Sequence, residues 1–232
     1  MAQQKPKPKL TREPTKHDTK KKPISILPKN EAQEKYVKAL HSACQMVVFG
    51  PSGTGKTYVV STVAASLYHT KDIDKIVITR PHVAVGERLG FLPGDLREKC
   101  EPWALPVLDV LDQHLGKGVV STGIKNGNIE IAPMALMRGR SFSNCFIICD
   151  EAQNITFHEL KMLLTRVGEG SKLVLNGDIM QSDLKEADGL SQIVRIIKKH
   201  DLPVPIVEFG VEDIVRSDHT KMWVKTFIKE GV

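Results

Sequence analysis

The sequence predicts an α/β fold, a doubly wound and mainly parallel sheet with helices on both faces. From about residue 24 onward, short apolar runs alternate with stretches of helical period, which is typical of strand–helix–strand units. One apolar run leads into a glycine-rich loop and a helix, and another ends in two adjacent carboxylates. Ligands of open α/β sheets bind at the carboxyl ends of the strands, so both features indicate a site at that edge.

Six strands and six helices are expected in alternation. The apolar runs that favour strands lie at residues 46–49, 76–79, 129–132, 146–149, 173–176 and 206–209. Helical period favours helices at 31–41, 56–68, 96–114 (interrupted by prolines), 157–166, 190–199 and 221–229. Residues 80–94 and the glycine-rich stretch 116–128 are expected to be loops or hairpin-like insertions.

The first 23 residues carry the whole net charge of the chain. They hold eight lysines and arginines against two acidic residues, so residues 24–232 hold 25 basic and 25 acidic residues. The segment alternates Lys and Pro with almost no apolar residues, and we expect it to be a disordered tail on a neutral domain spanning 24–232. It acts either as a solvated arm or as a weak phosphate-binding arm.

Composition narrows the class of protein. No apolar run approaches the roughly 18 to 20 residues that a membrane-spanning helix requires, and the N-terminus lacks the apolar region of a secretory signal. The four cysteines contain no Cys-x-x-Cys pair, and Cys145 and Cys149 flank an apolar run, which favours buried, reduced thiols over zinc ligands. We therefore expect a cytoplasmic protein with no membrane partner.

A phosphate-binding loop follows the first predicted strand. Residues 50–57 match G-x-x-x-x-G-K-[ST] in the strand–loop–helix context that this motif requires. Lys56 is expected to contact the β- and γ-phosphates, and the Thr57 hydroxyl to bind Mg²⁺. The residues expected to bind the nucleotide here are Gly50, Pro51, Ser52, Gly53, Thr54, Gly55, Lys56 and Thr57.

Two carboxylates follow the strand predicted at 146–149. Asp150 is expected to hold Mg²⁺ through its water shell, and Glu151 to act as general base toward the attacking water. The alternative is an ordinary helix start with first-turn charge, for which Asn154 or Thr156 is a suitable cap. The phosphate loop at residues 50–57 favours the metal site.

The strand predicted at 173–176 runs into a third polar segment. Gln181 is the candidate for contact with the γ-phosphate or the attacking water, with Asp178 supporting the loop. A simple surface turn is the alternative.

At these residues the chain resembles the PhoH-like ATPases, relatives of the superfamily 1 helicase core. The resemblance covers about residues 29–231. The compact single domain and the Lys-rich leader of this chain look more like a bacteriophage member of the family than like the longer bacterial ones. Ser217 stands where the family usually has His. The matching segments, in family order, are 50–57, 78–81, 86–95, 129–140, 146–154, 164–168, 177–181 and 213–216.

The resemblance implies a RecA-like P-loop fold, ATP as nucleotide and assembly into rings, with hexamers expected. It assigns adenine contact to Gln33, for which an exposed side chain before a helix is the alternative. Arg216 resembles a helicase sensor and is one candidate for an arginine finger, in cis or in trans. Arg80, Arg138 and Arg140 are candidates to line a nucleic-acid channel, with salt bridges to neighbours as the alternative. Arg166 is a further finger candidate.

Two functions are consistent with these residues. The first is Mg²⁺-dependent ATP hydrolysis coupled to binding or remodelling of RNA or single-stranded DNA by a ring. The alternative is an ATP-driven switch or assembly module that acts on a protein partner without moving along a strand. Trp103 and Trp223 lie at apolar helical spacing and favour core or interface roles over a base-stacking platform. The candidates for self-association are the apolar residues Trp103, Leu105, Val107, Leu108 and Leu111. The alternative, which Leu108 and Leu111 favour, is a helix folded back onto its own sheet.

Overall fold

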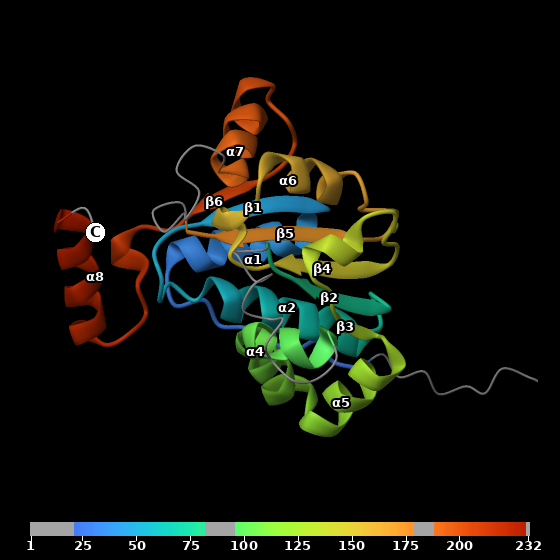
Figure 1. The fold of residues 1–232 in the computed structure, drawn as a ribbon. Coiled ribbons are helices and arrows are strands. Elements are labelled where there is room, and N and C mark those ends of the chain that lie inside the picture. Colours follow the sequence, from blue (N-terminus) through green and yellow to red (C-terminus); the bar gives the residue numbers. More distant parts are fainter. Residues whose placement is uncertain (1–20, 82–95, 179–187, 231–232) are drawn as a thin grey trace, which may run out of the picture.

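The centre of the molecule is a six-stranded sheet in which every strand pair is parallel. The computed structural model describes residues 21–81, 96–178 and 188–230, with the backbone alone for 96–101. The strand order is β3-β2-β4-β5-β1-β6 (Figure 1). The strands are β1 (Gln45–Phe49), β2 (Lys75–Thr79), β3 (Ile129–Ile131), β4 (Cys145–Cys149), β5 (Lys172–Gly177) and β6 (Ile206–Glu208).

Both faces of this sheet are buried, which explains why its strands are continuous apolar runs rather than alternating ones. Met46 and Val48 of β1 point into one core, and Val47 and Phe49 into the other. The pairing places Val48 opposite Asn176 of β5, so the phosphate loop begins beside the end of β5. All six predicted strands are confirmed to within one residue at each end.

Helices cover each face of the sheet. One core lies beneath α1 (Glu31–Ser42), α2 (Lys56–Thr70), α4 (Leu96–Leu115) and α5 (Lys117–Asn126). The other lies beneath α6 (Phe157–Leu164) and α7 (Gly189–Lys199), drawn above the sheet in Figure 1. The prediction of a doubly wound α/β sheet with helices on both faces is confirmed.

The expectation of a loop at 116–128 was wrong, because this stretch contains helix α5. Gly116 and Gly127 flank the helix with φ of +86° and +75°, so they bound it rather than prevent it. Gly123, inside the helix, packs against Ile129: a Cβ there would lie 2.9 Å from Ile129 Cδ1. Most of the other predicted loop, 80–94, lies outside the described residues.

The last helix, α8 (Asp218–Glu230), lies apart from the sheet layers (Figure 1). None of its residues is buried, and Trp223 and Phe227 stack on each other with 55 % and 48 % exposure. The core role expected for Trp223 was therefore wrong within this chain, while Trp103 is partly buried against the core. An interface role for Trp223 stays a prediction.

The apolar side chains of α4 turn mostly inward. Val107, Leu108 and Leu111 belong to the core, and Leu105 is 45 % exposed. The self-association role expected for Val107 was therefore wrong, because this residue covers the chain's own sheet. For Leu108 and Leu111 the alternative, a helix folded back onto its own sheet, is confirmed.

Among the described residues, packing of the N-terminal segment against the core begins at Ile24. Lys21, Lys22 and Pro23 are exposed, whereas the Ile24 backbone N–H donates to Ser66 Oγ at 3.0 Å and its side chain packs on the core. Cys145 and Cys149 are buried free thiols, as expected. Within the described ranges, the helices are all too short or too polar to cross a membrane.

Candidate functional site

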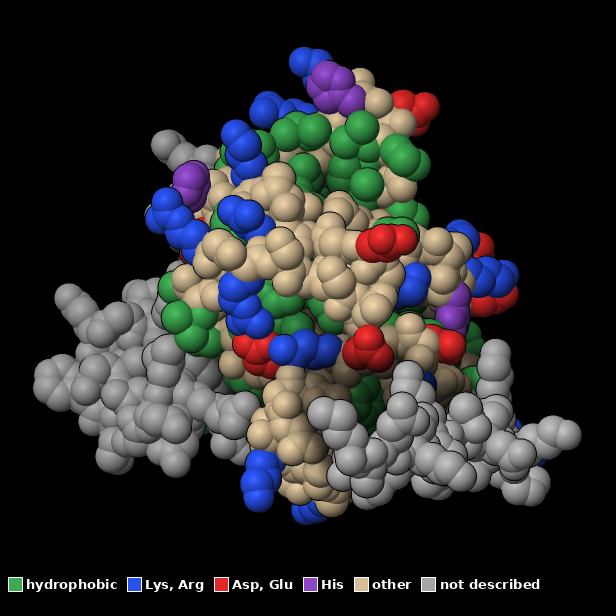
Figure 2. Space-filling view, turned by 90° about the vertical axis from the view of Figure 1, so that its right-hand side faces the viewer, with side chains coloured by type: hydrophobic (Ala, Val, Ile, Leu, Met, Phe, Trp, Pro, Cys, Tyr) green, Lys and Arg blue, Asp and Glu red, His purple; other side chains and the backbone are tan. Residues whose placement is uncertain are grey.

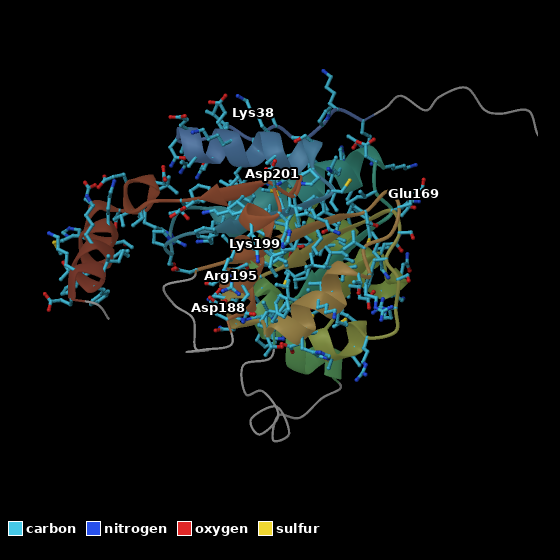
Figure 3. All side chains as sticks on the ribbon, turned by 90° about the horizontal axis from the view of Figure 1, so that it is seen from above. Lys38, Glu169, Asp188, Arg195, Lys199 and Asp201 are labelled. Atoms are coloured by element: carbon cyan, nitrogen blue, oxygen red, sulfur yellow. The ribbon has the colours of Figure 1, made fainter. Side chains whose placement is uncertain are left out.

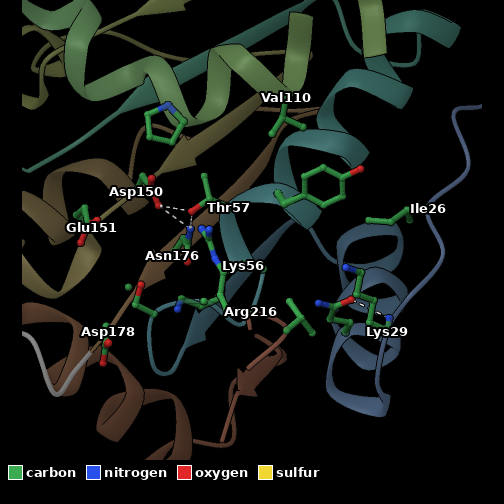
Figure 4. Close-up of a pocket in the computed structure, with 18 of the residues that line it drawn as sticks. Ile26, Lys29, Lys56, Thr57, Val110, Asp150, Glu151, Asn176, Asp178 and Arg216 are labelled. Carbon is green, nitrogen blue, oxygen red and sulfur yellow. Dashed lines mark hydrogen bonds between the residues drawn. The ribbon is translucent and has the colours of Figure 1, made fainter. Parts of the chain in front are cut away.

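A cavity of about 830 Å³ lies at the carboxyl edge of the sheet (Figure 4). Five parts of the chain line it: the segment before α1 with the first turn of that helix, the loop after β1 with the start of α2, one side of α4, the ends of β4 and β5, and residues 215–216. Segments far apart in the sequence therefore converge where the parallel strands end, which is where ligands bind in such sheets.

The loop after β1 has a conformation that its glycines permit. Gly50, Gly53 and Gly55 have φ of +143°, +84° and +84°, a region that L side chains rarely adopt. A Cβ at Gly50 would overlap the backbone carbonyl of Phe209 at the end of β6. Ser52, Gly53 and Gly55 line the cavity, and the first turn of α2 has no side-chain cap, so its amide groups remain available for an anion.

Lys56 is folded against this loop. Its Nζ donates to the carbonyl oxygens of Gly50 at 2.7 Å and Pro51 at 3.0 Å, and lies 3.4 Å from Thr54 Oγ1. Burial lowers the pKa of Lys56, while the carboxylates of Asp178, Asp150 and Glu151 oppose this effect. The lysine is therefore a half-buried cation held at the position where the motif contacts phosphate.

A polar triad lies below the loop. Thr57 Oγ1 donates to Asp150 Oδ1 at 3.3 Å, and Asn176 Nδ2 donates to Asp150 Oδ1 at 2.6 Å and to Thr57 Oγ1 at 3.1 Å (Figure 4). Burial, and secondarily Glu151, raise the pKa of Asp150 to about 6. A nearby cation would favour its charged form. A hydroxyl and a carboxylate are oxygen donors of the kind that Mg²⁺ prefers.

The second predicted carboxylate is held by a neighbour. Gln153 Nε2 donates to Glu151 Oε2 at 2.6 Å, and Gln153 Oε1 accepts from the Asp178 backbone N–H at 3.0 Å. Arg80 Nη2 lies 4.0 Å from Glu151 Oε1. Neither carboxylate starts a helix by side-chain capping, because Thr156 caps α6 and forms a capping box with Glu159.

Gln33 joins the N-terminal segment to the phosphate loop. Its Nε2 donates to the Thr54 carbonyl at 3.0 Å, and its Oε1 accepts from the Lys29 backbone N–H at 2.9 Å. Only 4 % of Gln33 is exposed, so the alternative of an exposed side chain is wrong. Each end of the amide makes one bond here and can make one more.

Arg216 lies over the phosphate loop of its own chain. A Cβ on Gly53 would lie 2.8 Å from Arg216 Cγ, and the Val215 backbone N–H donates to the Gly53 carbonyl at 3.0 Å. Ser217, which stands where the family usually has His, accepts from the Thr220 backbone N–H at 3.4 Å as α8 begins. The chain therefore brings Arg216 into the cavity without a second subunit.

Three predicted arginines lie away from the cavity. Arg140 donates to both oxygens of Glu130 at 2.6 and 2.8 Å, which is the salt-bridge alternative. Arg138 is exposed and does not line the cavity. The Arg166 carbonyl accepts from the Phe142 backbone N–H before β4, at the opposite edge of the sheet. Gln181 lies outside the described residues.

Asn176 and Gln153 are site residues that the sequence did not single out. Asn176 is the last polar side chain before the glycine that ends β5, and Gln153 follows the carboxylates by two positions. A polar residue in an otherwise apolar strand end was the available signal for Asn176. Both are nearly inaccessible, with 1 % and 2 % exposure.

The fold and the site together define the class of protein. A phosphate loop between β1 and α2, with a carboxylate at the end of β4 across the intervening strand β5, is the arrangement of a RecA-like P-loop NTPase fold. The chain belongs to the PhoH-like protein family, whose model matches residues 25–228.

Curated relatives agree with this family. Protein PhoH of Escherichia coli K12 is 45 % identical over 196 residues, which cover 83 % of this chain and 55 % of that protein. A PhoH-like protein of Mycobacterium tuberculosis H37Rv is 42 % identical over 194 residues, covering 83 % and 55 %. A PhoH-like protein of Bacillus subtilis 168 is 39 % identical over 209 residues, covering 89 % and 65 %. The chain thus spans little more than half the length of the first two.

One solved structure is a distant likeness. The SWI2/SNF2 ATPase core of Sulfolobus solfataricus, solved in complex with double-stranded DNA, gives a TM-score of 0.45 at 12 % identity, covering 81 % of this chain and 45 % of that chain. A likeness at that level supports no inference about function.

Proposed function

We propose that this protein is a Mg²⁺-dependent ATP hydrolase. The observation that carries the proposal is the contact between Thr57 Oγ1 and Asp150 Oδ1 at the base of the phosphate loop, with the half-buried Lys56 ammonium in the same cavity. Thr57 and Asp150 would hold Mg²⁺, which when bound neutralises charge on the β- and γ-phosphates. Lys56 exchanges its loop carbonyls for phosphate oxygens, which are stronger acceptors because they are charged.

Glu151 is the proposed general base. Gln153 occupies its Oε2, so Oε1 is the atom that takes the proton of the attacking water. Arg80 Nη2 lies 4.0 Å from that same oxygen. Gln181 remains a proposed contact of the γ-phosphate or the attacking water.

ATP is the proposed nucleotide because of Gln33. The free donor and acceptor of its amide match the N6 and N7 positions of adenine. Ile26, Leu27 and Tyr58 line the same cavity and provide apolar surface for a base.

Coupling to RNA or single-stranded DNA in a homo-oligomeric ring is the finer part of the proposal. Arg80 and the exposed Arg138 are its candidate contacts, whereas Arg140 already forms an ion pair with Glu130. On the face shown in Figure 2, basic side chains are interspersed with acidic ones. Figure 3 likewise shows Arg195 and Lys199 on α7, and Lys38 on α1, where it pairs with Glu34. On the face shown, strand binding would therefore depend on single basic residues rather than on a broad basic patch, and the proposed contacts are Arg80, Arg138 and the N-terminal tail.

The exposed apolar side of α8 supports the alternative, a switch or assembly module with a protein partner. Met222, Trp223, Phe227 and Ile228 are each more than a third exposed on this helix. Contiguous exposed apolar side chains are typical of protein interfaces. This surface serves equally well for ring assembly, so turnover must decide between the two functions.

The test is ATP turnover by the full chain with Mg²⁺ or with EDTA, and with or without single-stranded RNA or DNA. Hydrolysis that requires Mg²⁺ supports the enzyme, and its absence with Mg²⁺ contradicts it. Stimulation by a strand supports coupling, while turnover indifferent to every strand favours the protein partner. Removing residues 1–23 should flatten the salt dependence of strand binding if the tail holds phosphates, and leave basal turnover unchanged.

A further inference from the structure

Asn176 occupies a central position in the site that no part of the phosphate-loop motif specifies. It lies near the carboxyl end of β5, between the strand that ends in Asp150 and the strand that leads into the phosphate loop. Its side chain is 1 % exposed. Leu173, Val174 and Leu175, which precede it in the strand, are apolar and buried, so a polar side chain here is an exception that needs a reason.

The amide nitrogen of Asn176 serves two acceptors. Nδ2 lies 2.6 Å from Asp150 Oδ1 and 3.1 Å from Thr57 Oγ1, and these two oxygens are themselves 3.3 Å apart. The orientation of the amide is determined by its neighbours, because the reverse orientation would place its carbonyl oxygen against a carboxylate oxygen. Both N–H groups are therefore committed to the two oxygens that would hold a divalent cation.

Counting donors and lone pairs shows what this does to the two ligands. The Thr57 hydroxyl donates its one proton to Asp150 and accepts one bond from Asn176, which leaves one lone pair. Asp150 Oδ1 accepts both bonds, and the carboxylate has a second oxygen, Oδ2, that takes part in neither. The hydroxyl proton thus points at the carboxylate, and each ligand retains capacity for a cation or its water.

The carbonyl oxygen of the Asn176 amide does not bind either of these two oxygens or any other described group. Asn176 Oδ1 is buried and has no hydrogen-bond partner among the described residues. An unpaired buried carbonyl is unfavourable, whereas a leucine of similar shape would leave no polar atom unpaired. The two hydrogen bonds donated by Asn176 Nδ2 offset the cost of burying this carbonyl oxygen.

We propose that Asn176 is a positioning residue that orients Thr57 and Asp150 for Mg²⁺ before the metal binds. The proposal rests on the Mg²⁺-dependent nucleotide binding proposed above. Groups that orient metal ligands through hydrogen bonds typically change metal affinity by 10- to 100-fold when removed. A merely structural Asn176, tying β5 to β4, would instead affect folding and leave the metal dependence unchanged.

The experiment compares ADP binding by the full chain in EDTA and in saturating Mg²⁺, measured by titration calorimetry. Asn176→Leu keeps the branching at Cγ but cannot donate, and Asn176→Ala leaves room for a water. The control is Thr79→Val, because Thr79 also ends a central strand with a buried hydroxyl that lacks a partner among the described residues, yet does not line the cavity.

For Asn176→Leu we expect the Mg²⁺-dependent gain in ADP affinity to fall at least tenfold, with the Kd in EDTA within about twofold of the unchanged protein. The Mg²⁺-dependent gain should fall by less in Asn176→Ala, and it should be unchanged in Thr79→Val. An unchanged gain in Asn176→Leu would overturn the inference, as would failure of both Asn176 variants to fold. If ADP binding by the unchanged protein ignores Mg²⁺, the proposed function fails instead.

Discussion

Gln153 connects Glu151 to the loop that follows β5, because its amide bonds to both. The 2.6 Å bond to Glu151 Oε2 holds a residue whose φ is +53°, a left-handed conformation that is unfavourable for a side chain larger than glycine. The second bond, from the Asp178 backbone N–H, fixes the amide itself. The orientation of the proposed base therefore depends on a side chain that never needs to contact the nucleotide.

The first prediction concerns this amide. Gln153→Ala should lower kcat for ATP by about tenfold or more while changing nucleotide affinity by less than about twofold, because only the orientation of Glu151 is lost. Steady-state turnover and ADP titration measure the two quantities. Gln192→Ala, on α7, is the matched control and should change neither. Equal losses in kcat and affinity would mean that Gln153 supports the cavity as a whole.

The second prediction separates the roles of Lys56 and Glu151. Lys56→Ala removes phosphate contacts, so both ATP affinity and turnover should fall by an order of magnitude or more. Glu151→Gln keeps its shape and leaves Asp150 in place, so ATP should bind and remain uncleaved. Binding of labelled ATP and release of phosphate distinguish the two variants. Glu169→Gln, an exposed change in the loop before β5 (Figure 3) that does not line the cavity, should have no effect. Substantial hydrolysis by either site variant contradicts that residue's assignment.

The strands and the phosphate loop could be predicted because local features determine them. Apolar runs of four residues suffice for buried parallel strands, and the motif at 50–57 carries its own backbone requirements. Helix α5 could not be predicted, because glycines at 116, 123 and 127 suggest turns in the sequence. Only the structure shows that Gly123 lies inside the helix and allows it to pack closely on Ile129. Asn176 and Gln153 acquire their roles from the register of β4 and β5, which the sequence alone does not supply.

The third prediction concerns pH and stability at the edge of the sheet. Arg140 and Lys75 hold the pKa of Glu130 at about 2, below the 4.5 of a free glutamate. Because the pKa of Glu130 is lower in the folded than in the unfolded protein, its ionised carboxylate stabilises the fold above pH 4.5. This contribution to the free energy of unfolding is lost as the pH falls from 4.5 toward 2.

Glu130→Gln should therefore reduce the free energy of unfolding at pH 7 by about 1 to 2 kcal/mol, after allowance for screening of the partly exposed partners. The difference from the unchanged protein should shrink between pH 4.5 and 3. Urea unfolding of the two proteins at pH 7 and at pH 3 measures this difference in the free energy of unfolding, with Glu169→Gln as control. A difference independent of pH would show that packing, not charge, is responsible.

The fourth prediction concerns the exposed side of α8. Trp223→Glu should leave the urea midpoint of the chain unchanged, because no residue of α8 is buried. It should reduce the mass measured by light scattering with ATP present if α8 joins copies of the chain. His200→Glu, an exposed change of equal charge at the end of α7, should leave the mass as it is. An oligomer unaffected by Trp223→Glu would assign assembly to another surface.

The fifth prediction concerns whether Arg216 acts within its own subunit. Its Cγ lies against the phosphate loop at Gly53, and Val215 is bonded to the same glycine, so the geometry favours action in cis. Lys56→Ala subunits keep Arg216, and Arg216→Ala subunits keep an intact phosphate loop. If Arg216 serves its own cavity, mixing the two inactive proteins should restore no turnover, even where subunit exchange is verified with labelled chains. Recovery of turnover on mixing would place Arg216 at the cavity of the neighbouring subunit. Turnover would then require assembled subunits.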